Sequence, residues 1–208
     1  MNGNEDSKPT LQQEAVSIMN KDNRGPGFFA RFFREVWEFA KIVLISLAIV
    51  LPIRFFVAQP FIVRGASMQP TFHDGEYLIV DELSYFFRSP KRGEVIVFRY
   101  PQDPSQFFIK RIIGLPGETV IIEDGVVAIQ NEDNPGGLTL KESYLPPLLE
   151  TMPPMRKTVG ADEYFVLGDN RRESSDSRQW GVLDDQFLVG RTFLRLWPFG
   201  EVGVVTNL

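Results

Sequence analysis

The sequence predicts a mainly β protein, with a single N-terminal transmembrane helix followed by an extracytoplasmic domain of antiparallel sheets that carries an irregular insertion. Three observations support this fold class. An apolar segment with basic and aromatic flanks comes early, and short runs rich in Val, Ile, Phe and Tyr follow it between Gly, Pro and Asp turns. One stretch of Pro, Gly and polar residues then breaks this pattern.

The composition excludes several classes of function. The 208 residues carry a formal net charge of -5, and no basic patch of the kind that binds nucleic acid is present. The chain has no Cys and a single His, His73, so neither a disulfide framework nor a thiolate or His-rich metal site can form. We expect no nucleic-acid partner, no metal and no cofactor, although metal binding by carboxylates alone stays open.

Residues 28–58 are predicted to form a membrane anchor helix. The apolar segment Trp37–Val57 would be about 30 Å long as a helix, which is enough to cross a bilayer. Lys41 and Arg54 lie near its ends, where long basic side chains reach the interface. The uninterrupted apolar run Ile42–Ile53 is short, so a cleaved signal peptide and a buried helix of a soluble domain stay open as alternatives.

The basic residues predict the orientation of this anchor. Five basic residues precede the apolar core closely, and Arg54 and Arg64 are the basic residues soon after it; the five are Lys21, Arg24, Arg31, Arg34 and Lys41. The positive-inside rule therefore places the N-terminus in the cytoplasm and the β domain on the extracytoplasmic side. Residues 1–27 are polar and are predicted to be a disordered cytoplasmic tail.

The β domain is expected to comprise residues 59–130 and 161–208. Residues 131–160 are dense in Pro and Gly and are predicted to be an insertion, either an irregular loop or a small subdomain. The sequence Glu123-Asp124-Gly125 between two predicted strands indicates a tight hairpin. Strands are predicted at Tyr77–Asp81, Glu94–Tyr100, Phe107–Ile113, Thr119–Ile122, Val126–Gln130, Glu163–Leu167 and Leu188–Leu196.

Ser67 is the first candidate for chemistry. It lies in a turn between Gly65, which reaches backbone angles closed to other residues, and Pro70, whose ring fixes its own φ. A serine hydroxyl is a weak nucleophile at its free pKa and needs a base to take its proton. Without such a base, a serine in a polar turn is the simpler interpretation.

Lys110 is the candidate base. Strand alternation places it on one face with Phe108 and Ile112. Desolvation among apolar neighbours lowers a lysine pKa by about 3 to 5 units, which is enough to make a lysine a base. The alternative is an exposed lysine of an edge strand.

Gly168–Gly181 is a polar loop directly after a predicted strand, and we expect it to be ordered. Asp176 and Arg178 are close enough in sequence to pair across a turn. Taken alone, the loop is also compatible with a solvated surface.

Together these motifs resemble the type I signal peptidases, the membrane-bound Ser/Lys leader peptidases of bacteria and some organelles. The resemblance covers most of the chain, from the predicted anchor to about Gly200. It rests on four motifs in the order of the family, namely Ser67-Met68-x-Pro70-Thr71, Arg92–Phe98, Lys110–Gly117 and Gly168–Gly181.

The resemblance implies a role for individual residues. Ser67 would be the nucleophile and Lys110 its general base. Ser174 would help to orient the lysine, and Asp176 and Arg178 would form a structural ion pair beside the site.

The resemblance also implies contacts with the substrate. Met68 would help to line the pocket for the residue before the cleaved bond, and a substrate strand would pair near Gly65 and Ile109. Many relatives carry a serine where this chain has Gly65, and the hydroxyl of that serine assists the oxyanion hole. Oxyanion stabilisation here would therefore rest more on the backbone N–H of Ser67.

The implied function is that of a serine endopeptidase which removes N-terminal signal peptides from exported preproteins after small residues, at Ala-x-Ala type sites. Its partners would be the signal peptides of secreted preproteins and the lipid bilayer of a plasma (inner) or thylakoid membrane. Three alternatives are weighed against it. They are a catalytically inactive, membrane-tethered signal-peptide-binding protein, a Ser/His/Asp hydrolase that uses His73, and a self-cleaving Ser/Lys repressor.

Overall fold

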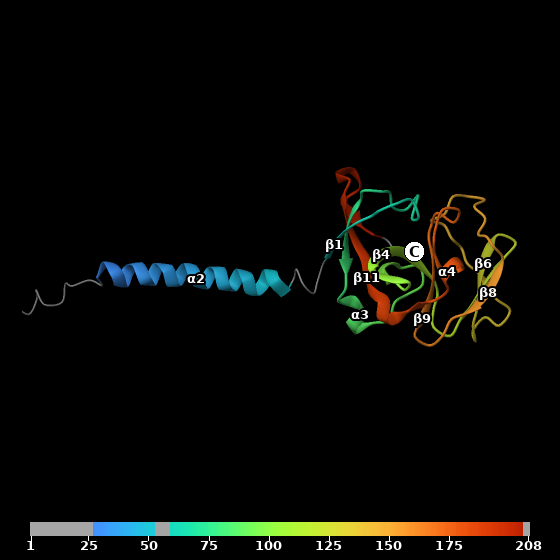
Figure 1. Ribbon diagram of the computed structural model, residues 1–208, viewed down its shortest axis with the longest axis horizontal. Helices are drawn as coiled ribbons and strands as arrows, with labels where there is room; N and C mark the ends of the chain where they lie inside the picture. Colours follow the sequence, from blue (N-terminus) through green and yellow to red (C-terminus); the bar gives the residue numbers. More distant parts are fainter. Residues whose placement is uncertain (1–26, 53–58, 206–208) are drawn as a thin grey trace, which may run out of the picture. The chain divides into compact units, whose positions relative to one another are not determined.

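The structure is a computed structural model that describes residues 27–52 and 59–205. The chain divides into two compact units, Met1–Leu51 and Pro52–Leu208, and each is described by itself. The predicted cytoplasmic tail lies almost wholly outside the described residues. Within the described residues, the helix α2 (Phe28–Pro52) makes up nearly all of the first unit and is drawn as the long coiled ribbon in Figure 1.

Helix α2 begins where the predicted anchor begins, but the predicted membrane span is not confirmed. In the part of the chain that the structure describes, no helix is both long enough and apolar enough to cross a membrane. Residues 53–58, the end of the predicted anchor, lie outside the described ranges. From its start to Lys41, the apolar residues of α2 are also interrupted by charged ones, namely Arg31, Arg34, Glu35, Glu38 and Lys41.

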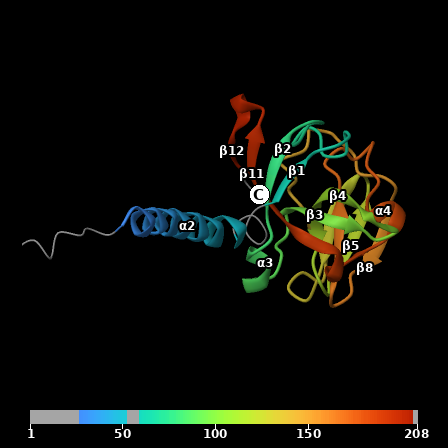
Figure 2. The same cartoon turned by 60° about the vertical axis from the view of Figure 1, so that its left-hand side comes forward.

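The second unit is built of antiparallel sheets, as predicted. Its larger sheet has the strand order β1-β2-β11-β3-β4-β9-β10, and β12 pairs with β11. Figure 2 shows β12 beside β11 and β1 beside β2. These strands are β1 (Gln59–Ile62), β2 (Tyr77–Asp81), β3 (Val95–Tyr100), β4 (Asp103–Gly114), β9 (Glu163–Leu167), β10 (Leu183–Asp184), β11 (Leu188–Trp197) and β12 (Gly203–Val204).

The smaller sheet has the strand order β7-β6-β5-β8. Its strands β6 and β8 are labelled in Figure 1. The predicted hairpin joins β5 to β6, and Asp124 and Gly125 in its turn both have positive φ, 49° and 78°. The stretch predicted as an irregular insertion includes two of these strands, since β7 and β8 lie within residues 131–160. The bounds are β5 (Thr119–Glu123), β6 (Val126–Gln130), β7 (Leu138–Thr139) and β8 (Met155–Thr158).

The helices of the second unit are short. The α-helices are α3 (Ser84–Phe87) and α4 (Ser177–Trp180), and 3-10 turns cover Asp185–Phe187 and Phe199–Glu201. Asp176 caps α4, because its side chain accepts a hydrogen bond from the backbone N–H of Arg178.

The C-terminal half of β4 is buried on both of its faces. Ile112 packs into a cluster with Phe98 and Val166, whereas its neighbour Ile113 packs into the cluster of the smaller sheet with Phe165. Consecutive strand residues point to opposite faces. Any side chain on this part of β4 therefore lies in the interior, whatever its polarity.

Gly114 ends β4 at a close approach of the two sheets, which yields a stability prediction. A Cβ atom there would lie 2.5 Å from Val120 Cγ2 and 2.9 Å from Phe165 Cβ. We expect Gly114→Ala to lower the free energy of unfolding by about 1 to 3 kcal/mol, because strand backbone must move. Urea denaturation measures this loss. The control is Gly136→Ala, where a Cβ meets nothing within 4 Å; equal losses in both variants would contradict the explanation.

Candidate active site

A groove of about 680 Å³ lies beside Ser67, between β1 and the middle of β4. Strand β1 is the edge of the larger sheet and pairs with β2. At Phe107–Ile109, β4 pairs with β3, and its pairing with β9 begins only at Arg111. Among the described strands, both walls of the groove thus have a free edge. The lining includes Phe61, Ile62, Arg64, Phe107, Phe108 and Ile109.

Ser67 and Lys110 meet at this groove. Lys110 Nζ lies 2.8 Å from Ser67 Oγ and also donates to the carbonyl oxygen of Ile109 at 2.8 Å. The turn that presents Ser67 has the predicted glycine conformation, with φ of 82° at Gly65. The backbone N–H of Gly65 donates to the carboxylate of Asp74 at 2.7 Å. The hydroxyl and the amine are therefore in hydrogen-bonding contact, as nucleophilic catalysis requires.

Lys110 is buried, with 3% of its surface exposed, which rules out an exposed edge-strand lysine. Burial disfavours the ammonium form and lowers the pKa of Lys110 to about 8, although Asp176 and Asp169 act in the opposite direction. The amine also lies 5.3 Å from the centre of the Phe108 ring. Near neutral pH, an appreciable fraction of Lys110 is thus uncharged and able to accept a proton.

The loop after β9 holds the backbone of the nucleophile. The backbone N–H of Asn170 donates to the carbonyl oxygen of Ser67 at 3.0 Å, and its side-chain amide donates to that of Ala66 at 3.2 Å. Gly168 makes this approach possible, because a Cβ there would lie 2.5 Å from the Ser67 carbonyl oxygen and 2.1 Å from Ser174 Oγ.

Asp176 and Arg178 form the predicted ion pair in the same loop. The carboxylate accepts from Arg178 Nε at 2.8 Å and from Nη2 at 2.7 Å, and it also accepts from the backbone N–H of Gly168 at 3.0 Å. Arg178 donates onward to the carbonyl oxygens of Met152 and Arg171. The pair therefore fixes the shape of the loop that holds Ser67.

The other predicted site residues differ in whether they line the groove. Ser174 is buried, but its hydroxyl has no hydrogen-bond partner within the described residues, so its role towards the lysine stays a prediction. Ile109 lines the groove, whereas Gly65 and Met68 are not among its lining residues. Met68 is buried in a core cluster with Phe72.

His73 does not support the Ser/His alternative. Its side chain is 56% exposed, and its Nδ1 lies 3.4 Å from a carboxylate oxygen of Glu76. His73 is also absent from the lining of the groove that contains Ser67 and Lys110.

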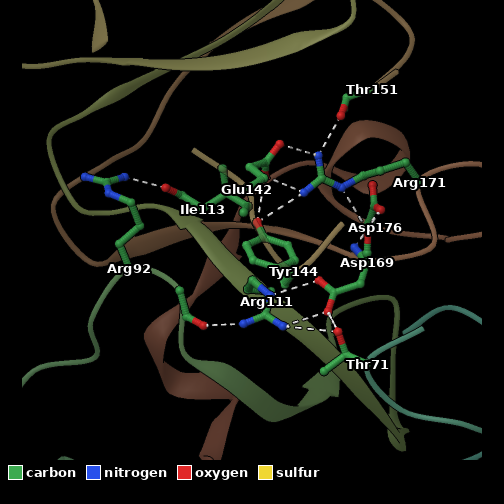
Figure 3. A network of polar contacts seen from close by, with 12 residues as sticks. Thr71, Arg92, Arg111, Ile113, Glu142, Tyr144, Thr151, Asp169, Arg171 and Asp176 are labelled. Carbon is green, nitrogen blue, oxygen red and sulfur yellow. Dashed lines mark hydrogen bonds and ion pairs between the residues drawn. The ribbon is translucent and has the colours of Figure 1, made fainter. Parts of the chain in front are cut away.

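Arg111 and Asp169 form a buried ion pair that sequence reasoning missed. Arg111 Nε and Nη2 donate to the two carboxylate oxygens of Asp169 at 2.9 and 2.7 Å (Figure 3). The hydroxyl of Thr71, in the Ser67 turn, donates to the same carboxylate at 2.5 Å. A signal was present, because residues adjacent to Lys110 on a strand must point to the opposite face, and a guanidinium buried there needs a carboxylate.

Comparisons with known proteins agree on one family. The model of the family "Signal peptidase, peptidase S26" matches residues 36–197. The probable signal peptidase I-1 of Synechocystis is 37% identical and is matched over 82% of this chain and 90% of that protein. The signal peptidase I of Leptolyngbya laminosa is 41% identical over 80% of this chain and 82% of its own. The thylakoidal processing peptidase 1 of Arabidopsis thaliana is 31% identical over 86% of this chain and 54% of its own.

The environment of Lys110 yields a prediction about its titration. We expect an NMR titration of the lysine side chains to give Lys110 a pKa near 8. Asp176→Asn should lower that pKa further, because the carboxylate stabilises the ammonium form. The control is Asp133→Asn, an exposed position within residues 131–160. An ordinary lysine pKa in the wild type, or a pKa that rises in Asp176→Asn, would refute this account of the site.

Proposed function

Because this chain belongs to the signal peptidase family, peptidase S26, we propose that it is a serine endopeptidase with a Ser/Lys dyad that removes signal peptides from exported preproteins. The observation that carries the proposal is the contact of 2.8 Å between the buried amine of Lys110 and the hydroxyl of Ser67, at the end of an open groove. A protein that only binds signal peptides has no use for a buried lysine with a lowered pKa, so the binding-only alternative is not favoured.

The proposed reaction is acyl transfer through Ser67. Neutral Lys110 takes the proton of the Ser67 hydroxyl while Oγ attacks the scissile carbonyl carbon. The resulting ammonium then gives its proton to the leaving amine, and the signal peptide stays attached to Ser67 as an ester. Lys110 next takes a proton from a water molecule that attacks the ester carbonyl carbon. The ammonium then returns a proton to Ser67 Oγ as the bond between Oγ and the acyl carbon breaks, which releases the signal peptide and restores the neutral amine.

We assign the oxyanion to the backbone N–H of Ser67, supported by the rigid turn around it. Gly65 and Asn170 keep this turn in place through the hydrogen bonds described above. A donor whose position is fixed before the reaction stabilises the developing negative charge without further reorganisation.

The groove fits an extended peptide with small residues before the cleaved bond. A strand that enters it would find free backbone edges at β1 and at Phe107–Ile109, and alternate side chains would face the walls. Bulky side chains such as Phe61 and Ile62 line the groove and restrict its width. We therefore propose cleavage at Ala-x-Ala type sites.

We also propose that the protein acts at a plasma (inner) or thylakoid membrane, with its N-terminus in the cytoplasm and the β unit on the opposite side. The basis is the similarity to signal peptidase I proteins and to a thylakoidal processing peptidase, together with the Lys and Arg residues that closely precede residue 42. Protease digestion of a C-terminal tag in sealed spheroplasts checks this orientation. The added protease reaches only the outer face of the membrane, so the tag should be digested, and protection of the tag would contradict the proposal.

Cleavage assays in detergent test the proposed function. With a preprotein that carries an Ala-x-Ala site, we expect the wild type to cut after the second Ala. Ser67→Ala and Lys110→Ala should lose cleavage by roughly 10³-fold or more, because each removes a member of the catalytic pair. His73→Ala is the control and should cut like the wild type. A folded Ser67→Ala variant that still cuts at the wild-type rate would refute the proposal.

A further inference from the structure

Arg171 is a second buried arginine next to the active site, and every N–H of its guanidinium has an acceptor (Figure 3). Nε donates to the carbonyl oxygen of Gly168 at 3.1 Å. Nη1 donates to Glu142 at 3.0 Å and to Thr151 at 2.6 Å. Nη2 donates to Glu142 at 2.5 Å and to the hydroxyl of Tyr144 at 3.3 Å. Three of these four partners come from residues 131–160, to which neither motif nor mechanism assigns a role.

Arg171 and its partners are connected to the nucleophile through Asn170. Arg171 directly follows Asn170, whose backbone and side chain hold the carbonyl oxygens of Ser67 and Ala66. Because Arg171 also binds Gly168, it constrains the loop on both sides of Asn170. Any displacement of Arg171 is therefore transmitted to the turn that presents the Ser67 hydroxyl.

The same group of residues is connected to the base, Lys110, through Tyr144 and Arg111. The hydroxyl of Tyr144 donates to Glu142 at 2.6 Å, and its ring lies 3.9 Å from the guanidinium carbon of Arg111. Arg111 follows Lys110 in β4 and is fixed by its ion pair with Asp169. The ring of Tyr144 thus covers the arginine that anchors the lysine strand.

The ion pair between Glu142 and Arg171 makes this connection strong. The side chain of Arg171 is fully buried, and that of Glu142 is only 12% exposed. Removing one partner of a buried pair leaves an uncompensated charge, which is strongly unfavourable. Without the carboxylate of Glu142, the loop must shift or admit water, and either change reaches Ser67 and Lys110.

We propose that Glu142 and Tyr144 are positioning residues for the proposed peptidase reaction, and that the insertion sets the geometry of the Ser67–Lys110 pair through Arg171. The inference rests on the proposed function for its reaction, but its structural content is independent of cleavage. Neither residue lines the groove, so both act through Arg171 and Arg111 rather than on the substrate.

The test compares Glu142→Gln, Glu142→Asp and Tyr144→Phe with the wild type in cleavage assays over a range of pH. In the wild type, kcat/KM should rise with pH through about 8 as Lys110 loses its proton. We expect Glu142→Gln to lower kcat by roughly 10- to 100-fold through misplacement of the pair, with KM changed less than about twofold. Glu142→Asp keeps the charge, so its kcat should lie between those of the wild type and Glu142→Gln. Tyr144→Phe should lose less kcat than Glu142→Gln.

The acidic limb of the pH profile gives a readout that a merely structural role would not move. Displacement of the loop changes the burial of Lys110 and its distance from Asp169 and Asp176, which together set its pKa, so the limb should move away from its wild-type position in Glu142→Gln. The matched control is Glu132→Gln, an exposed glutamate of the same insertion, which should keep the wild-type kcat and profile. Rates are taken per folded molecule, so that a loss of folded protein alone is not counted.

Two outcomes would overturn the proposal. In the first, the folded fraction of Glu142→Gln has the wild-type kcat and pH profile. If Glu142→Gln does not fold, a wild-type kcat and pH profile in Tyr144→Phe, which keeps the ring over Arg111, overturns the proposal instead. The other is an NMR titration in which Lys110 keeps its wild-type pKa in both variants. That titration needs no substrate, so it decides the positioning role even if the wild type cleaves nothing and the proposed function fails.

Discussion

A lysine amine that is shut away from water cannot keep its ordinary pKa, and the site depends on this constraint. Lys110 is buried because the C-terminal half of β4 is covered on both faces. The same covering buries Arg111 on the opposite face, where a guanidinium cannot lose its charge and must find a carboxylate. Asp169 supplies it and thereby ties the polar loop to the strand of the base. One strand thus lowers the pKa of an amine and recruits the loop that holds the nucleophile.

The loop after β9 joins the elements that carry the two reacting groups. Gly168 allows it to pass close to Ser67, Asn170 holds the carbonyl oxygens of the nucleophile turn, and Asp169 binds both Arg111 and Thr71. Asp176, paired with Arg178, also accepts a hydrogen bond from the backbone N–H of Gly168 and so connects the two ends of this loop. These contacts explain why a rigid polar segment accompanies a dyad that needs only one hydroxyl and one amine.

Residues 131–160 extend the same principle beyond the sequence motifs. They add β7 and β8 to the smaller sheet, and they also send Glu142, Tyr144 and Thr151 to Arg171. A stretch rich in Pro and Gly can therefore be ordered where its polar side chains meet a buried charge. Val159 is the only apolar residue of 131–160 that is buried, whereas Arg171 receives polar contacts from three residues of this stretch.

The sequence by itself determined the local structure of this protein. Strand alternation, turn residues and motif order predicted the five long strands of the larger sheet, β2, β3, β4, β9 and β11, but not the short strands β1, β10 and β12. They also predicted the hairpin at Asp124-Gly125, the ion pair of Asp176 with Arg178 and the two candidates Ser67 and Lys110. Such features depend on neighbours a few residues apart. The tertiary structure alone decided that Lys110 lies 2.8 Å from Ser67 across 43 residues of sequence, that Arg111 pairs with Asp169, and that Arg171 pairs with Glu142. It also placed Met68 in the core and showed no membrane-spanning helix within the described residues. Contacts between distant segments follow from how the sheets pack, and periodicity along the chain carries no information about that packing.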